Sequence, residues 1–104
     1  MNREELSEKL KALGDVQRLE ILELLQGGSQ SASALLEHLE IGQSTLSHHM
    51  QQLCKAGFVS ARRDGKWTYY AINPDAVWRC ADQISRLSYV RRSNTPASLP
   101  TALL

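Results

Sequence analysis

Apolar residues recur every three or four positions through the first part of the chain, and this spacing predicts a series of short helices. The first stripe consists of Leu6, Leu10 and Leu13, and Gly14 ends that helix. Asp15 is placed to cap a second helix, which stops at Gly27-Gly28. The apolar residues of this second helix are Val16, Leu19, Ile21, Leu22, Leu24 and Leu25.

Two further helices are predicted, separated by a tight turn. The third covers about residues 32–39, and the turn is Glu40-Ile41-Gly42. The fourth covers about residues 43–55 and ends at Gly57. Two short helices joined by a turn of this length that contains a glycine form a helix-turn-helix.

The pattern then changes to two strands. Residues 59–63 and 67–72 are rich in β-branched and aromatic side chains. Asp64-Gly65 lies between them, a pair that is favoured in two-residue hairpin turns. Asn73-Pro74 follows and predicts the start of a helix, with asparagine as the cap and proline at the first helical position.

The last helix is predicted to run to about Arg92, and one of its faces carries Val77, Cys80, Ile84 and Leu87. So small a domain has few residues left to cover this stripe, and Leu6, Leu10 and Leu13 form a matching one near the other end of the chain. We therefore expect a homodimer. Residues 93–104 are rich in Ser, Thr and Pro and are predicted to be a flexible tail, which leaves one domain over residues 1–92.

A length of 104 residues fits one domain with a small core. The predicted order is four helices, two strands and a final helix. This order is a mostly α fold with a small β-hairpin, the winged helix-turn-helix, here expected as a dimer.

The charge of the chain is unevenly divided. The formal net charge is only +1, which alone argues against nucleic acid as a partner. Residues 1–40 carry eight acidic and four basic residues, a net −4, whereas residues 41–104 carry three acidic and eight basic residues, a net +5. A chain divided in this way can turn its basic half toward phosphate.

The two cysteines, Cys54 and Cys80, are too few for a disulfide scaffold. There is no apolar run for a signal peptide, nor the roughly 20 apolar residues that a membrane span needs. The sequence therefore predicts a reduced, cytoplasmic protein without a membrane partner.

The fourth helix has the features of a helix that reads DNA. Leu46, Met50 and Leu53 share its apolar face. The opposite face is short, polar and uncharged in its first two turns and carries Ser44, Ser47, His48 and Gln51. With Gln43 and Thr45 in the first turn, these are the candidate DNA-binding residues of the helix. Such side chains donate or accept hydrogen bonds at base edges, whereas acids would repel phosphate. The alternative is an ordinary polar surface helix.

The hairpin tip is basic. Arg62, Arg63 and Lys66 lie there against one acid, Asp64. A basic hairpin beside a recognition helix suits contact with backbone phosphates or the minor groove. The alternative is an edge strand whose charges prevent strand addition. Of the aromatic residues Trp67, Tyr69 and Tyr70, we expect some to lie in the core rather than to stack on bases.

The histidines and cysteines predict no metal site. His48 and His49 are adjacent on a helix and point about 100° apart, so they cannot easily share a metal. His49 is expected to flank the core, and His38 stands alone. Cys80 lies on the apolar stripe and is expected to be buried, whereas Cys54 lies at a boundary position. These two thiols are the candidates for sensing an effector.

Three segments in order resemble the ArsR-type (arsenic repressor) family of winged helix-turn-helix regulators, over about residues 6–87. They are Leu13-Gly14-Asp15-Val16-Gln17-Arg18-Leu19-Glu20-Ile21-Leu22, Gln43-Ser44-Thr45-Leu46-Ser47-His48-His49-Met50 and Arg63-Asp64-Gly65-Lys66-Trp67-Thr68-Tyr69-Tyr70. The resemblance implies a homodimer formed by the first and last helices. The apolar stripes of these helices make Leu6, Leu10, Val77, Cys80, Ile84 and Leu87 the candidate interface residues. The resemblance also implies repression by operator binding that an effector relieves, with DNA contacts at Gln43, Ser44, Ser47 and His48.

The chain departs from the metal-sensing members of the family. Many carry a Cys-x-Cys box on the third helix, where this chain has Ser31-Ala32-Ser33-Ala34-Leu35-Leu36. Others place histidines on the last helix, which here has none. Cys54 lies about where some arsenic sensors have a cysteine, but the partner cysteines near the N-terminus are missing. No recognised metal site is complete, and no cofactor is expected.

We interpret the chain as a sequence-specific DNA-binding regulator, an effector-relieved repressor of an inverted-repeat operator. The alternatives are a winged-helix protein-interaction module and a small cysteine-dependent enzyme. The sequence shows no catalytic constellation, so we expect no enzyme. The effector stays open between a thiophilic ion, an oxidant or sulfur species, an organic molecule and none.

Overall fold

A computed structural model describes residues 1–90 of the chain; the predicted tail over residues 93–104 and the predicted helix end at Arg92 lie outside this range. The helices are α1 (Arg3–Leu13), α2 (Val16–Leu24), α3 (Ala32–His38), α4 (Gln43–Lys55) and α5 (Pro74–Arg86), with a short 3₁₀ helix η1 (Leu25–Gly27). The strands are β1 (Gln30–Ser31), β2 (Val59–Asp64) and β3 (Trp67–Ile72). No helix within these 90 residues is long and apolar enough to cross a membrane.

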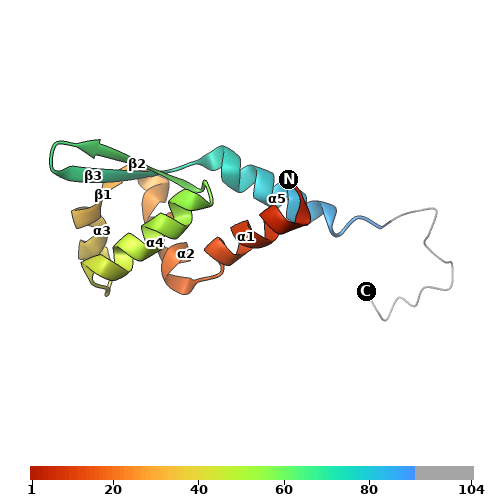
Figure 1. The fold of residues 1–104 in the computed structure, drawn as a ribbon, viewed down its shortest axis with the longest axis horizontal. Coiled ribbons are helices and arrows are strands. Elements are labelled where there is room, and N and C mark those ends of the chain that lie inside the picture. The colour runs from red at the N-terminus through yellow and green to blue at the C-terminus, as the bar shows by residue number, and fades with distance from the viewer. Residues whose placement is uncertain (91–104) are drawn as a thin grey trace.

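One hydrophobic core joins all the long helices to the base of the hairpin. Its fully buried side chains come from α2, η1, α3, α4 and α5 and from the segment before β2; the largest are Ile21, Leu25, Leu35, Leu46, Met50, Leu53, Phe58 and Cys80. Figure 1 shows the hairpin tip and α3 at one end of the molecule, and α1 with α5 at the other. The helix that carries the predicted DNA-reading face, α4, lies between them.

The hairpin is part of a three-stranded antiparallel sheet, in the order β1-β3-β2. The two-residue strand β1 pairs with β3 through Gln30 opposite Tyr70 and Ser31 opposite Tyr69. Sequence reasoning missed β1, because two residues carry no periodic pattern. The strand fixes the root of the hairpin against the helix-turn-helix, since Ser31 also caps α3 by accepting a hydrogen bond from the backbone N–H of Ala34 at 3.1 Å.

The turn of the hairpin lies one residue later than predicted. Asp64 pairs with Trp67, so the two loop residues are Gly65 and Lys66 rather than Asp64 and Gly65. Gly65 has a φ of 62°, and no residue other than glycine in residues 1–90 has a positive φ. Glycine at the first central position is typical of a type II′ turn, whose twist matches that of the strands. Lys66 is therefore at the tip of the loop.

Two helices differ from their predicted form. Val16 and Leu19 were grouped with the apolar residues of the second helix, but they are 83% and 46% exposed, because α2 buries its opposite side through Ile21. The last helix ends at Arg86 rather than near Arg92. There the backbone N–H groups of Leu87, Ser88 and Tyr89 bond to carbonyls three residues back, which tightens the chain into a turn.

The start of α5 is also only partly as predicted. Pro74 occupies the first turn, as expected. Asn73 does not cap the helix with its side chain. Instead its amide donates to the carbonyl oxygen of Gly57 at 3.2 Å, and its backbone N–H donates to that of Phe58 at 2.8 Å. Asn73 therefore ties the end of the hairpin to the end of α4.

Candidate nucleic-acid interface

The polar face of α4 is fully presented at the surface. All six residues predicted to contact DNA from this helix are exposed: Gln43, Ser44, Thr45, Ser47, His48 and Gln51. The first turn contains no acidic residue, so its free backbone N–H groups are left without a competing carboxylate. Leu46, Met50 and Leu53 are at most 2% exposed, which fixes the helix with this polar face outward.

The end of α4 is locked by a Schellman motif. Gly57, with a φ of 85°, donates its backbone N–H to the carbonyl of Cys54 at 3.0 Å, and Phe58 donates to that of Leu53 at 3.0 Å. Leu53 and Phe58 are both 0% exposed and supply the hydrophobic contact that accompanies this motif. The chain thus leaves the recognition helix in one fixed direction, toward β2.

The basic residues of the hairpin tip differ in their surroundings. The guanidinium of Arg62 lies 4.8 Å from the centre of the Tyr69 ring and 3.6 Å from the carboxylate of Asp64. Within residues 1–90 no such ion pair or aromatic contact holds the side chain of Arg63, which points to the other face of β2. Lys66 lies 5.5 Å from the ring centre of Trp67. All three basic side chains are exposed.

The aromatic residues of β3 divide as the alternation of a strand requires. Trp67 is 46% exposed near the tip, whereas Tyr70 packs against the core. Burial raises the pKa of the Tyr70 phenol above its ordinary value. Of the three aromatic residues, Tyr70 is the one that packs against the core.

His49 is a core histidine, as expected, and it takes part in a polar cluster that sequence reasoning missed. It is 5% exposed, and both of its ring nitrogens have partners on α2, namely Arg18 and Gln17. The two histidines of α4 therefore differ: His48 lies on the surface and His49 in the interior. The adjacency of the two gave no signal of the α2 partners, which are more than thirty positions away.

The possible metal ligands of residues 1–90 do not cluster within one chain. Residues 1–90 contain no group of three or more His, Cys, Asp or Glu side chains that could hold a metal ion. Both cysteines are free thiols. Cys80 is 1% exposed, and burial raises the pKa of the partly buried Cys54 thiol, which disfavours the reactive thiolate.

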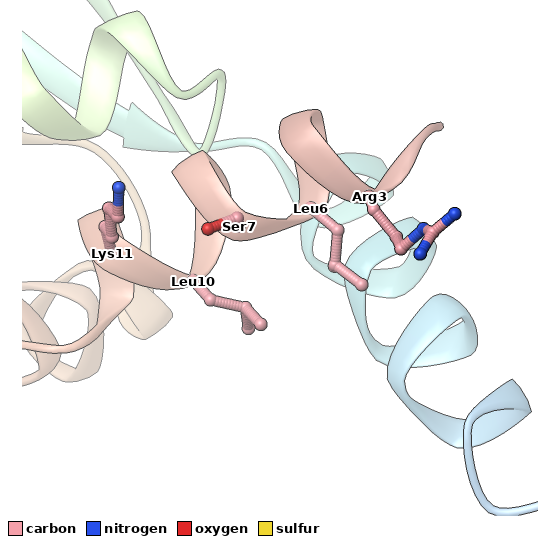
Figure 2. A pocket seen from close by; sticks show the side chains of 5 residues that line it. All are labelled: Arg3, Leu6, Ser7, Leu10 and Lys11. Atoms are coloured by element: carbon pink, nitrogen blue, oxygen red, sulfur yellow. The ribbon is translucent and has the colours of Figure 1, made fainter.

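The terminal helices carry the predicted dimer stripe only in part. Leu6 and Cys80 are 6% and 1% exposed and pack inside the chain's own core, so they leave little surface for a second chain. Leu10, Ile84 and Leu87 are exposed by 38%, 42% and 73%, and Val77 is partly buried. Figure 2 shows Leu6 and Leu10 on α1, where they line an open pocket of about 390 Å³ with Arg3, Ser7 and Lys11.

One large apolar side chain of α5 was missed. Trp78 is 74% exposed, beyond the edge of the predicted stripe. Tyr89 and Val90, which follow the helix, are 70% and 65% exposed. Their composition was visible in the sequence, but a stripe defined by Val77 and Ile84 leaves Trp78 about 100° away on the helix. The exposed apolar surface of α5 is therefore wider than the stripe alone.

These features together define a winged helix-turn-helix of the kind that regulators of transcription use: an exposed, uncharged polar helix, fixed by a helix-turn-helix and flanked by a basic hairpin. The sequence comparisons agree. Residues 15–61 match the model of the bacterial regulatory protein arsR family. The chain belongs to this family, which confirms the resemblance seen in its three motifs.

Individual relatives cover most of the chain. The arsenical resistance operon repressor of Staphylococcus aureus is 43% identical over 94 residues, which are 90% of this chain and 88% of the relative. Among solved structures, an ArsR-like transcriptional regulator from Rhodococcus has a TM-score of 0.72 at 29% identity, covering 80% of this chain and 78% of its own. A homodimeric winged helix-turn-helix DNA-binding domain from Mycobacterium bovis has a TM-score of 0.68 at 28% identity, covering 89% and 88%.

Proposed function

We propose that the chain is a homodimeric repressor that binds an inverted-repeat DNA operator and is released from it by an effector. In this proposal α4 enters the major groove, and the hairpin contacts the flanking backbone. The observation that carries the proposal is the polar face of α4: six exposed side chains without a charge, beside a basic hairpin tip. Such a surface can hydrogen-bond to base edges while the neighbouring cations hold phosphate.

The dimer is supported by the terminal helices. Leu10, Ile84, Leu87 and Trp78 leave apolar surface exposed at the end of the molecule opposite the hairpin tip. The Mycobacterium bovis domain with the same fold is homodimeric. A second copy related by a twofold axis would present two recognition helices about 34–36 Å apart, which is one turn of DNA. This geometry is the reason for expecting an inverted repeat.

The cations of the hairpin tip fit the same orientation. Residues 1–40 carry a net −4 and residues 41–104 a net +5, but this division does not separate two ends of the molecule, because α3 lies with the hairpin tip and α5 lies with α1. The exposed cations of the hairpin are Arg62, Arg63 and Lys66. Non-specific affinity for DNA should therefore come from a few cations, chiefly those of the hairpin tip, rather than from the chain as a whole.

We propose release by an effector and leave open which molecule or ion it is. Staphylococcus aureus has an arsenical resistance operon repressor among the relatives of this chain. The thiols of this chain are poorly disposed for a similar signal, because Cys80 is buried and the pKa of Cys54 is raised by burial. A site shared between two chains would still be open to Cys54, and thiol sensing stays a hypothesis on that basis.

Binding to duplex DNA at two salt concentrations tests the proposal against a protein-interaction module. A pool of random duplexes should bind the wild-type protein, with an affinity that falls steeply as salt rises. Sedimentation of a complex with a short duplex should show two chains per DNA. A protein without measurable affinity for any duplex at low salt would leave the interaction module as the better interpretation.

A further inference from the structure

A single buried histidine connects the recognition helix to the two helices that begin the chain. The Nδ1 atom of His49 accepts a hydrogen bond from the Nε–H of Arg18 at 3.0 Å. Its Nε2 atom lies 2.7 Å from the amide oxygen of Gln17. His49 lies on the interior side of α4, next in sequence to the exposed His48, and the centres of the two rings are 5.9 Å apart.

The partners of the ring fix its protonation state by geometry alone. A guanidinium can only donate, so Nδ1 must carry a lone pair toward Arg18. The oxygen of Gln17 can only accept, so Nε2 must carry the hydrogen. The imidazole is therefore neutral in this arrangement. A second proton on Nδ1 would face the N–H of a permanently charged guanidinium and would break the contact.

Arg18 extends the connection to α1. Its terminal nitrogen donates to the carbonyl oxygens of Ala12 at 3.3 Å and Lys11 at 3.5 Å, which belong to the last turn of α1. The carbonyl of Lys11 also accepts from the backbone N–H of Gly14 at 3.3 Å, whereas that of Ala12, in the last turn, lacks a partner within its own helix and is satisfied by the guanidinium. Because the guanidinium of Arg18 is planar and rigid, this one side chain holds the end of α1 and the middle of α4 at the same time.

The position of Arg18 is itself fixed. Asp15 caps α2, and its carboxylate accepts from the backbone N–H groups of Gln17 at 2.9 Å and Arg18 at 3.1 Å. The hydrogen bond from the backbone N–H of Arg18 lowers the pKa of Asp15 below its ordinary value, although burial acts in the opposite direction. The carboxylate is therefore charged when the cap is formed. The cap, the guanidinium and the imidazole thus form one continuous hydrogen-bonded series from α2 to α4.

We propose that His49 is a positioning residue, which in its neutral form is held by Arg18 and Gln17 and sets the orientation in which α4 presents its polar face to DNA. The inference rests on the proposed operator binding and deepens it. His49 itself touches no DNA. It acts through the backbone of α4 and hence on Ser47, His48 and Gln51, which lie on the outward side.

The arrangement makes operator binding sensitive to acid. The groups that face the ring are Asp15 at 4.0 Å, Arg18, Gln17 and His48. Burial lowers the pKa of His49 most, Asp15 opposes this, and Arg18 and His48 lower the pKa further. Because the folded-state pKa lies below the unfolded value of about 6.5, this contribution is complete above that value and is lost as the pH falls through the folded-state pKa.

Three variants test the proposal, with the duplex that wild-type protein selects from a random pool as the probe. His49→Ala removes both contacts, and Arg18→Lys cannot hold α1 and α4 together. Each should weaken binding by roughly tenfold or more at about pH 7.5, in protein that sediments as a folded dimer. His49→Asn keeps an acceptor in the place of Nδ1 and cannot titrate near neutrality. It should retain more affinity than His49→Ala, and below about pH 6.5 it should not lose affinity as wild-type protein does.

The matched control is His38→Asn, which removes an exposed histidine from α3 and should leave the acid weakening in place. Folded, dimeric His49→Ala protein with wild-type affinity and pH profile would overturn the proposal. If that variant does not fold, equal losses in His49→Asn and Arg18→Lys, with the acid weakening retained in His49→Asn, would overturn it instead. A wild-type protein that selects no duplex would contradict the proposed function and not this inference.

Discussion

At the scale of single residues, the two arginines of the hairpin tip, Arg62 and Arg63, differ in their contacts. Arg62 is engaged by the ring of Tyr69 and by Asp64, whereas Arg63 makes no such contact within residues 1–90 and is available to phosphate. Arg63→Ala should weaken binding to all duplexes and make the salt dependence shallower by about one unit of slope. Arg62→Ala, the matched control, should have a smaller effect on the slope. Anisotropy titrations at several salt concentrations measure both, and equal slopes for Arg63→Ala and wild type would remove Arg63 from the interface.

The two cysteines are the residues that could sense a thiol-reactive effector. Cys80 is a buried small side chain, and burial raises the pKa of the Cys54 thiol, which disfavours its thiolate at neutral pH. A Cys54→Ser, Cys80→Ala double variant should therefore respond to arsenite, zinc and peroxide as wild-type protein does in a duplex-release assay. Loss of release with unchanged DNA affinity would establish thiol sensing, and single variants would then assign it to one cysteine.

Residue identity predicted much of the candidate site, but not its internal partners. The polar face of α4 and the basic tip followed from the residue types and the helical period. The pairing of His49 with Arg18 could not be predicted, because the two are separated by 31 positions and meet only when α2 packs on α4. The separation of Arg62 from Arg63 by alternation was predictable, but the register that places Tyr69 opposite Arg62 was not.

At the scale of elements, the exit from the recognition helix depends on Gly57. Its φ of 85° is unfavourable for any residue with a side chain, although an added Cβ would lie 3.9 Å from Lys9 Nζ, an ordinary contact. Gly57→Ala should therefore destabilise the fold by about 1 kcal/mol through backbone strain. Gly27→Ala, where the φ is not in this region and nothing lies within 4 Å, should leave stability unchanged or slightly increased. Urea unfolding compares the two, and an unchanged midpoint for Gly57→Ala would contradict the assigned role of the motif.

The boundaries of elements were predictable where a local signal existed. The bounds of α4 were predictable because its apolar period and Gly57 indicate the same helix end. The start of α5 was predictable because Pro74 fits only the first turn of a helix. The strand β1 has no such signal, and it forms only because β3 offers an open edge beside it. The end of α5 was predicted too late, since Ser88 donates its hydroxyl to the carbonyl of Ser85 at 2.6 Å and closes a turn that polar composition alone does not reveal.

At the scale of the whole molecule, the proposed function requires two chains joined through α1 and α5. Ile84→Glu places a charge in the exposed apolar surface of α5, where it is solvated in a monomer but buried in a dimer. The variant should remain folded and sediment as a monomer at micromolar concentration. Ser33→Glu, which adds the same charge at an exposed position of α3, should remain a dimer. A wild-type protein that sediments as a stable monomer would contradict the proposed assembly.

In the proposed dimer, a pair of α4 helices reads the sequence of DNA. Selection from a random duplex library, followed by sequencing of the bound fraction, measures it directly. Wild-type protein should enrich an inverted repeat whose half-site centres are about 10–10.5 base pairs apart, or a multiple of one turn. His48→Ala or Gln51→Ala should relax the preference at particular positions, by roughly 1–3 kcal/mol for each hydrogen-bonded base that the side chain reads. Enrichment of no common sequence, or an identical preference in these variants, would show that α4 does not read bases.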